Sequence, residues 1–231
     1  GVNPSDDGGG VFVSGASTRA AFVGCVISGN RATNRGGGIR VLESTVRMSR
    51  CRIFGNYAEG GGGVWIDSYS DVEIRESLIH DNEVSTPGGA VYVYDHSTAL
   101  LQNCTISENS SSSGTNGVHI RASGSLVVSS SIIWGNGTSD ILNDPGNLGE
   151  LSIGYSDVGG GFPLNATNSG GNISSDPLFS SDPDSAYRLT SSSPCIDAGD
   201  PSSELDPDET RAGMGALSFP QPCQVRSEAR R

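Results

Sequence analysis

CRIFGN, residues 51–56, is one of five versions of a single hexapeptide in this chain. The other versions are CVISGN (25–30), SLIHDN (77–82), CTISEN (104–109) and SIIWGN (131–136). Each begins with Cys or Ser, has Ile in third place and ends with Asn. Successive Asn residues are 26 or 27 positions apart, and Asn3 lies 27 positions before the first hexapeptide's Asn30. A fixed period of this length is typical of a solenoid protein, in which each repeat forms one coil.

Each repeat holds two further short apolar segments. A polar stretch, usually ending in glycines, follows each Asn and leads into an apolar–x–apolar triplet. The triplets are Val11-Phe12-Val13, Ile39-Arg40-Val41, Val64-Trp65-Ile66, Val91-Tyr92-Val93 and Val118-His119-Ile120. After each triplet comes another short segment in which apolar residues alternate with other residues. These apolar pairs are Val46/Met48, Val72/Ile74, Ala99/Leu101 and Leu126/Val128. Period-two alternation between turn residues indicates strands. We therefore predict an all-β parallel β-helix with three strands per coil and about 26–27 residues per coil.

The repeated positions have distinct expected roles. Strands stack at about 4.7–4.9 Å, so isoleucines of successive coils should fill the core, with small Cys or Ser where the coil is narrow. The Asn side chains are expected at a corner, where amides bond their counterparts above and below. Alternatively, Asn is only a turn residue that tolerates positive φ. A leucine-rich repeat has a similar length, but its Leu-x-x-Leu-x-Leu signature is missing.

Composition excludes several classes of protein. The chain has 231 residues, 33 of them Gly, which disfavours a helical bundle. Its formal charge of −12 argues against nucleic acid as a partner. It contains no Lys, which excludes Schiff-base chemistry. No apolar run approaches the roughly 20 residues of a membrane span, and we expect none.

The later motifs resemble one group of proteins. SIIWGN, IGYSDVGGG, GGNISSDPLF, AYRLTSSSPCIDAGDP and DETRAGMGALSF follow in the order seen in bacterial right-handed parallel β-helix proteins with a choice-of-anchor type C-terminal region. The sequence departs from that group at AGMGALSF, where Asp usually precedes Met-Gly-Ala and Tyr-Glu follows it. The resemblance implies export, an extracellular or cell-surface location and a β-helix, but no single reaction.

We expect coils over residues 1–158 and a loop-rich cap with a basic tail over 159–231, packed on the last coil. The chain opens in phase with the Asn column and ends in Arg230-Arg231. We expect both ends to be held by a second copy or another chain. The alternatives are that an upstream segment has been trimmed, or that the cap holds the tail.

The five cysteines divide into two sets. Cys25, Cys51 and Cys104 share one inward column, and we interpret them as small core residues with parallel side chains rather than as a disulfide or metal site. Cys195 and Cys223 lie in the cap, where a disulfide bond would stabilise an exported protein. We predict that these two cysteines form one. The cap turns also carry Asp197, Asp200, Asp206 and Asp208. These acids are candidate Ca²⁺ ligands, although Asp-rich turns are more often only turns.

One face of the predicted helix is rich in aromatic and charged residues. The middle positions of the triplets point outward and give Phe12, Arg40, Trp65, Tyr92 and His119. The next outward column gives Ser14, Leu42, Asp67, Tyr94 and Arg121, and Tyr69, Asp95 and His96 lie on adjoining turns. We predict ligand-binding roles for Arg40, Trp65, Asp67, Tyr92, Tyr94, His119 and Arg121. The alternatives are a surface covered by another subunit or an ordinary strand surface.

Two functions follow from this face. The first is a secreted or cell-surface structural or adhesive protein that assembles with itself or another chain and contacts glycan. The second is a polysaccharide lyase acting on an acidic polysaccharide, with His119 as base beside Tyr94 and Arg121. Hydrolysis is disfavoured because only Asp67 supplies a carboxylate on the face itself, with Asp95 on a turn, and a hydrolase needs two.

Overall fold

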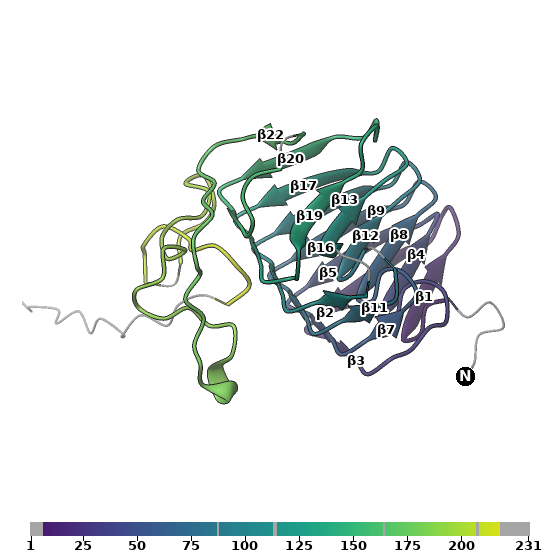
Figure 1. Ribbon diagram of the computed structural model, residues 1–231, viewed down its shortest axis with the longest axis horizontal. Helices are drawn as coiled ribbons and strands as arrows, with labels where there is room; N and C mark the ends of the chain where they lie inside the picture. Colours follow the sequence, from purple (N-terminus) through teal and green to yellow (C-terminus); the bar gives the residue numbers. More distant parts are fainter. Residues whose placement is uncertain (1–6, 87, 113–114, 164, 207, 218–231) are drawn as a thin grey trace, which may run out of the picture.

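The computed structural model describes residues 7–217 except 87, 113–114, 164 and 207. It is an all-β parallel solenoid of about 6 turns, as the sequence predicts. Figure 1 shows the coils stacked from the purple N-terminal coil to the green C-terminal coil, with the later green and yellow segment outside the stack. The one helix in the described part is a single 3-10 turn, Pro183–Ser185, so no described helix is long enough to cross a membrane.

Three long sheets run along the stack, one strand per coil, and all their pairings are parallel. Sheet 1 contains β1 (Val11–Ser14), β4 (Ile39–Leu42), β8 (Val64–Asp67), β12 (Val91–Val93), β16 (Thr115–Ile120) and β19 (Ser139–Asn143). Sheet 2 contains β2 (Arg19–Val23), β5 (Thr45–Ser49), β9 (Asp71–Arg75), β13 (Thr98–Gln102), β17 (Ser125–Ser129), β20 (Leu151–Gly154) and β22 (Thr167–Asn168). Sheet 3 contains β3 (Val26–Ser28), β6 (Arg52–Phe54), β10 (Leu78–His80), β14 (Thr105–Ser107), β18 (Ile132–Trp134) and β21 (Asp157–Val158). A small corner sheet joins β7 (Tyr57–Ala58), β11 (Glu83–Val84) and β15 (Ser110–Ser111).

The predicted isoleucine column forms the centre of the core. Ile27, Ile53, Ile79, Ile106 and Ile133 are Cα partners in sheet 3 from coil to coil. All five are buried. A side chain of this size removed from water on every side contributes about 1.5–3 kcal/mol. The repeat therefore sets both the register of the coils and the packing between them.

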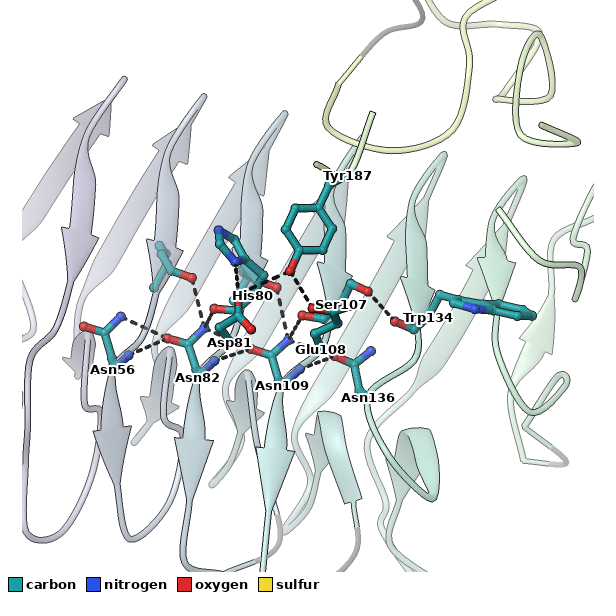
Figure 2. A network of polar contacts seen from close by, with 12 residues as sticks. Asn56, His80, Asp81, Asn82, Ser107, Glu108, Asn109, Trp134, Asn136 and Tyr187 are labelled. Atoms are coloured by element: carbon teal, nitrogen blue, oxygen red, sulfur yellow. Dashed lines mark hydrogen bonds and ion pairs between the residues drawn. The ribbon is translucent and has the colours of Figure 1, made fainter. Parts of the chain in front are cut away.

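The Asn residues form a hydrogen-bonded ladder at the corner after sheet 3, which confirms the first interpretation of this column. The side-chain amides of Asn30, Asn56, Asn82 and Asn109 each donate to the Oδ1 atom of the next Asn at 2.8–2.9 Å. Figure 2 shows the part of the ladder from Asn56 to Asn136. Each backbone N–H donates to the same oxygen. The ladder ends at Asn136, whose amide donates to the Asp140 carboxylate. This carboxylate replaces the oxygen that a further Asn would supply.

The first cysteine set behaves as predicted. Cys51 and Cys104 are buried and free, and Cys25 is free and half-buried. Ser77 and Ser131 continue the column, and their hydroxyls accept the backbone N–H groups of Cys51 and Cys104. Burial raises the pKa of the Cys104 thiol to about 12, so it stays a thiol at neutral pH. These residues are inert packing groups.

The chain after the coils has two parts with different positions. Residues 159–175, the closing segment, form a last partial coil: β22 pairs with β20, and Phe162 and Ala166 pack against the core. Residues 176–217, the returning segment, instead fold back over the outer face of sheet 3. There Leu189, Cys195 and Met214 form a second apolar cluster with Ile132 of β18. The returning segment therefore covers the side of the solenoid and also reaches β21, where the Cys195 thiol contacts Asp157. Residues 218–231 lie outside the described residues, and the division of the chain at residue 159 stays a prediction.

Candidate functional site

The outward residues of the triplets are adjacent to one another in the structure, as the repeats predict. Phe12, Arg40, Trp65, Tyr92 and His119 are successive Cα partners along sheet 1. We call this row and its flanking side chains the ladder face. The Trp65 and Tyr92 rings stack with centroids 4.2 Å apart and planes 13° apart, and His119 meets Tyr92 edge-on at 4.6 Å. Such contacts are worth about 0.5–1.5 kcal/mol each beyond area burial.

The central row is not exposed, however. Arg40, Trp65, Tyr92 and His119 are 7%, 7%, 6% and 4% exposed, and only Phe12, at 39%, is open to solvent. We had expected a ligand to meet these side chains directly. The structure places them in a packed outer layer, and the side chains that stay accessible are those at the rim of the face.

Glycine turns bury the row. The turns that precede the Trp65 and Tyr92 triplets fold over the rings of those two residues. A Cβ atom on Gly60 would lie 2.6 Å from the Trp65 ring, and one on Gly88, where φ is +113°, would lie 2.1 Å from the Tyr92 ring. Only glycine permits this approach. The glycines that mark the repeats in the sequence therefore have a second role, since they let the turns lie on the aromatic row.

An ion-pair network closes the N-terminal half of the face. The Arg40 guanidinium contacts the Asp7 carboxylate and lies 3.0 Å from the Asp67 carboxylate. The Trp65 indole N–H donates to the same Asp67 oxygen at 2.8 Å. Arg35 lies 3.6 Å from Asp67 and packs over the Trp65 ring. Because Arg40 and Asp67 are buried, their ion pair stabilises the row. Removing either charge would leave the other buried without its partner in this pair, which is destabilising.

A second polar group orders the C-terminal half. His119 Nε2 lies 2.7 Å from the Asp144 carboxylate, whose other oxygen lies 3.1 Å from Arg121 Nε. Burial raises the pKa of the Tyr92 hydroxyl, and the nearby Arg121 side chain acts in the opposite direction. Asp144 was absent from the predicted set because it lies in an Asp-Pro-Gly turn between strands, outside the repeated columns.

The rim carries the accessible chemistry of the ladder face. The Arg121 side chain is 59% exposed and Arg35 is 40% exposed. Tyr94 is half-buried, with its ring 5.9 Å from Trp65 and 6.0 Å from Tyr92. On the adjoining turn, the exposed Tyr69 ring stacks on His96 at 5.0 Å and 9°. The face thus offers aromatic surfaces beside guanidinium groups, over a rigid support.

The positions of His119, Tyr94 and Arg121 can be compared with the roles predicted for them in a lyase. A general base must come within hydrogen-bond reach of its substrate. His119 has one ring nitrogen on Asp144, and its other, Nδ1, is buried with no hydrogen-bond partner among the described residues. Tyr94 and Arg121 remain at the rim. The three residues are therefore brought together, with the predicted base beneath the surface.

The acids proposed for Ca²⁺ bind protein donors. The Thr210 hydroxyl lies 2.8 Å from Asp197 and 2.7 Å from Asp208. Asp206 accepts the Gly213 N–H, and Asp200 accepts the Ser202 N–H. Within residues 7–217, with their gaps, no three His, Cys, Asp or Glu side chains are grouped to hold a metal ion. The Ca²⁺ assignment stays a prediction.

The predicted Cys195–Cys223 disulfide also stays a prediction, because Cys223 lies outside the described residues. Cys195 is fully buried, and its thiol lies 3.2 Å from the Asp157 carboxylate. Burial is the main cause that raises the pKa of Asp157, with the nearby Asp140 and Asp176 charges acting in the same direction.

The family model described as right handed beta helix region matches residues 4–175. The chain belongs to this family. The match to the right-handed β-helix family ends where the closing segment ends, so the resemblance of the later motifs to choice-of-anchor regions stays a prediction. No curated protein and no solved structure matches the chain significantly.

Proposed function

We propose that this right-handed β-helix is a secreted or cell-surface adhesive protein of bacterial origin that binds glycan through the rim of its ladder face. The observation that carries the proposal is the row from Arg40 to His119, which stacks in register and is locked by buried ion pairs. A pre-organised face loses little entropy on binding. Its rim combines aromatic and guanidinium groups, which suit sugar rings and their hydroxyl or acid substituents.

The adhesive function is better supported than the lyase. His119, the predicted base, is 4% exposed and bonded to Asp144, so proton abstraction would need the outer layer to open. Binding at Tyr94 and Arg121 needs no such rearrangement. The C-terminal motifs from GGNISSDPLF onward support export and a surface location, because they resemble choice-of-anchor regions.

Self-assembly is a separate part of the proposal. Val23, the last residue of β2, and Val26, the first residue of β3, are 59% and 62% exposed. Exposed apolar side chains that lie close together favour association with another chain. Sedimentation of the protein across a wide concentration range tests this part: a strictly monomeric protein would contradict it.

Glycan binding is tested by calorimetry against a panel of neutral and acidic polysaccharides. We expect Tyr94→Ala and Arg121→Ala each to weaken binding at least tenfold. The matched controls are Tyr57→Ala and Arg31→Ala, because the Arg31 guanidinium lies 3.9 Å from the Tyr57 ring at a different corner. Equal losses in both pairs, or no binding by the unmodified protein, would refute the assignment. Unsaturated products from an acidic polysaccharide would establish the lyase instead.

A further inference from the structure

A second candidate site lies on another side of the molecule, outside the ladder face. A cleft of about 460 Å³ opens between sheet 3 and the returning segment. Ser107 and Glu108 of the solenoid, Trp134 of β18, and Asp176 and Phe179 of the returning segment line it. This volume is in the usual range for a small-molecule site, about 300–1,000 Å³.

The cleft exists because one ring is missing from an outward column. Phe54, His80, Ser107 and Trp134 are successive Cα partners on sheet 3. Phe54 and His80 stack at 4.9 Å and 8°, and the Tyr187 ring of the returning segment covers His80 at 4.7 Å. The next position, Ser107, carries only a hydroxyl group. Ser107 is itself 2% exposed and donates its hydroxyl to the Trp134 carbonyl oxygen at 2.7 Å, so the gap that forms the cleft lies above this small residue, next to Trp134.

The walls of this gap suit a sugar ring. Trp134 on the solenoid and Phe179 on the returning segment supply the aromatic surface. Both are half-buried, so their orientation is constrained while part of each ring stays accessible. Aromatic rings of this kind bind ligands that are apolar on one side and polar at the edge.

The polar groups of the cleft are acidic. Glu108 has one oxygen 3.1 Å from the Tyr187 hydroxyl, which also contacts Asp81 (Figure 2). Asp176 accepts the Leu178 N–H at 2.9 Å. In the described part of the chain only one oxygen of each carboxylate takes a hydrogen bond, and no Arg or His lines the cleft. Residues 76–231 carry six Arg against nineteen Asp and Glu, so the surrounding field is negative as well.

Glu108 occupies a backbone position that favours glycine. Gly29, Gly55 and Gly135 take the equivalent place in other coils, and all have positive φ. Asp81 and Glu108 keep this conformation, at φ 51° and 55°, in the two coils under Tyr187. A non-glycine residue here costs roughly 1 kcal/mol. The same conformation recurs at other corners of the solenoid, for example at Arg50, Glu76 and Asn103, so it belongs to the turn of the coil and places the Glu108 side chain at that corner.

We propose that this cleft binds an amino sugar, with the ring against Trp134 and Phe179 and the protonated amine between Glu108 and Asp176. We infer a positive charge on the ligand because the described lining residues include two carboxylates and no basic side chain. Uronic acids, which suit the arginine-bearing ladder face, are excluded here by charge. The cleft thus extends the proposed function with a second glycan site of opposite charge preference.

The test uses calorimetry with a β-1,4-linked glucosamine disaccharide, its N-acetylated form and a glucuronate disaccharide on the full chain. We expect binding of the first, at least tenfold weaker binding of the second, and none of the third. Glu108→Gln and Asp176→Asn should each weaken glucosamine binding at least tenfold. Glu83→Gln, at an exposed side chain of β11, is the matched control and should leave the affinity unchanged.

Trp134 is tested by conservative replacement because it also packs against the returning segment. Trp134→Phe keeps a ring and should weaken binding by a smaller factor than Trp134→Ala, with the fold checked by circular dichroism. Equal binding of the three disaccharides, or unchanged affinity in both carboxylate variants, would overturn the proposal. Tyr94→Ala and Arg121→Ala should leave glucosamine binding in the cleft unchanged. The proposal for the cleft and the proposal for the ladder face can therefore be refuted separately.

Discussion

Asp67 accepts the indole N–H of Trp65 at 2.8 Å and lies 3.0 Å from the guanidinium of Arg40. The Asp67 carboxylate thus orients the Trp65 ring, where the aromatic stack begins. It also neutralises the Arg40 guanidinium of the preceding coil. The stack and the ion pairs are therefore one unit, and disturbing Asp67 should disturb both.

Asp67→Ala should lower the free energy of unfolding by about 3–5 kcal/mol, because it removes one partner of a buried ion pair. Denaturant titration measures the loss, and Trp65 emission should change with it. Asp71→Ala is the control, since the exposed Asp71 bonds only a Thr hydroxyl and should cost about 0.5–1.5 kcal/mol. Equal effects would mean that the network contributes little.

Asn82→Ala should interrupt the ladder in its middle. The Asn56 amide and backbone N–H would lose their acceptor, and each buried unsatisfied donor costs about 1–3 kcal/mol. We expect a large drop in the denaturation midpoint. Asn165→Ala, at an exposed position, should change it little; a similar loss there would argue against a structural ladder.

Gly88→Ala tests whether the turn must lie on the Tyr92 ring. The new Cβ would clash with that ring and the backbone would be strained, so the cost should exceed that of strain alone by about 1–3 kcal/mol. Gly146→Ala isolates the strain, because φ is +83° and nothing lies within 4 Å of the added atom. Thermal unfolding of the two variants should separate them; coincident transitions would contradict the packing.

Asp157 should make the protein less stable as the pH rises. Burial raises its pKa above the usual value of 3.8, so the folded state binds the proton more tightly than the unfolded state. Its contribution to stability is therefore complete below about pH 3.8 and is lost as the pH rises through the higher folded pKa.

Asp157→Asn removes this titration while keeping an oxygen for the Ser175 N–H. Relative to the unmodified protein, the variant should gain stability between pH 4 and pH 7. Denaturant unfolding at several pH values gives the difference curve. A flat curve, or one with the opposite slope, would show that Asp157 is not protonated preferentially in the folded state.

The candidate ladder-face residues were predictable from the sequence because they occur once per repeat. A regular period places Trp65 over Arg40 and Tyr92 over Trp65 whatever the details of the turns. Asp144 and Asp7 could not be found in this way, since neither belongs to a repeated column. The burial of the row was also hidden, because it depends on how closely the glycine turns approach the rings.

The coil, its register, the isoleucine core and the Asn ladder could all be predicted from the repeats, because a 26–27-residue period places each side chain on its counterpart in the next coil. What covers the outside of that coil could be learned only from the folded chain. The returning segment lies on sheet 3. There the Tyr187 hydroxyl contacts Asp81 and Glu108, which precede Tyr187 by 106 and 79 residues in the sequence. Such contacts follow from the path of a non-repeating chain and leave no periodic signal.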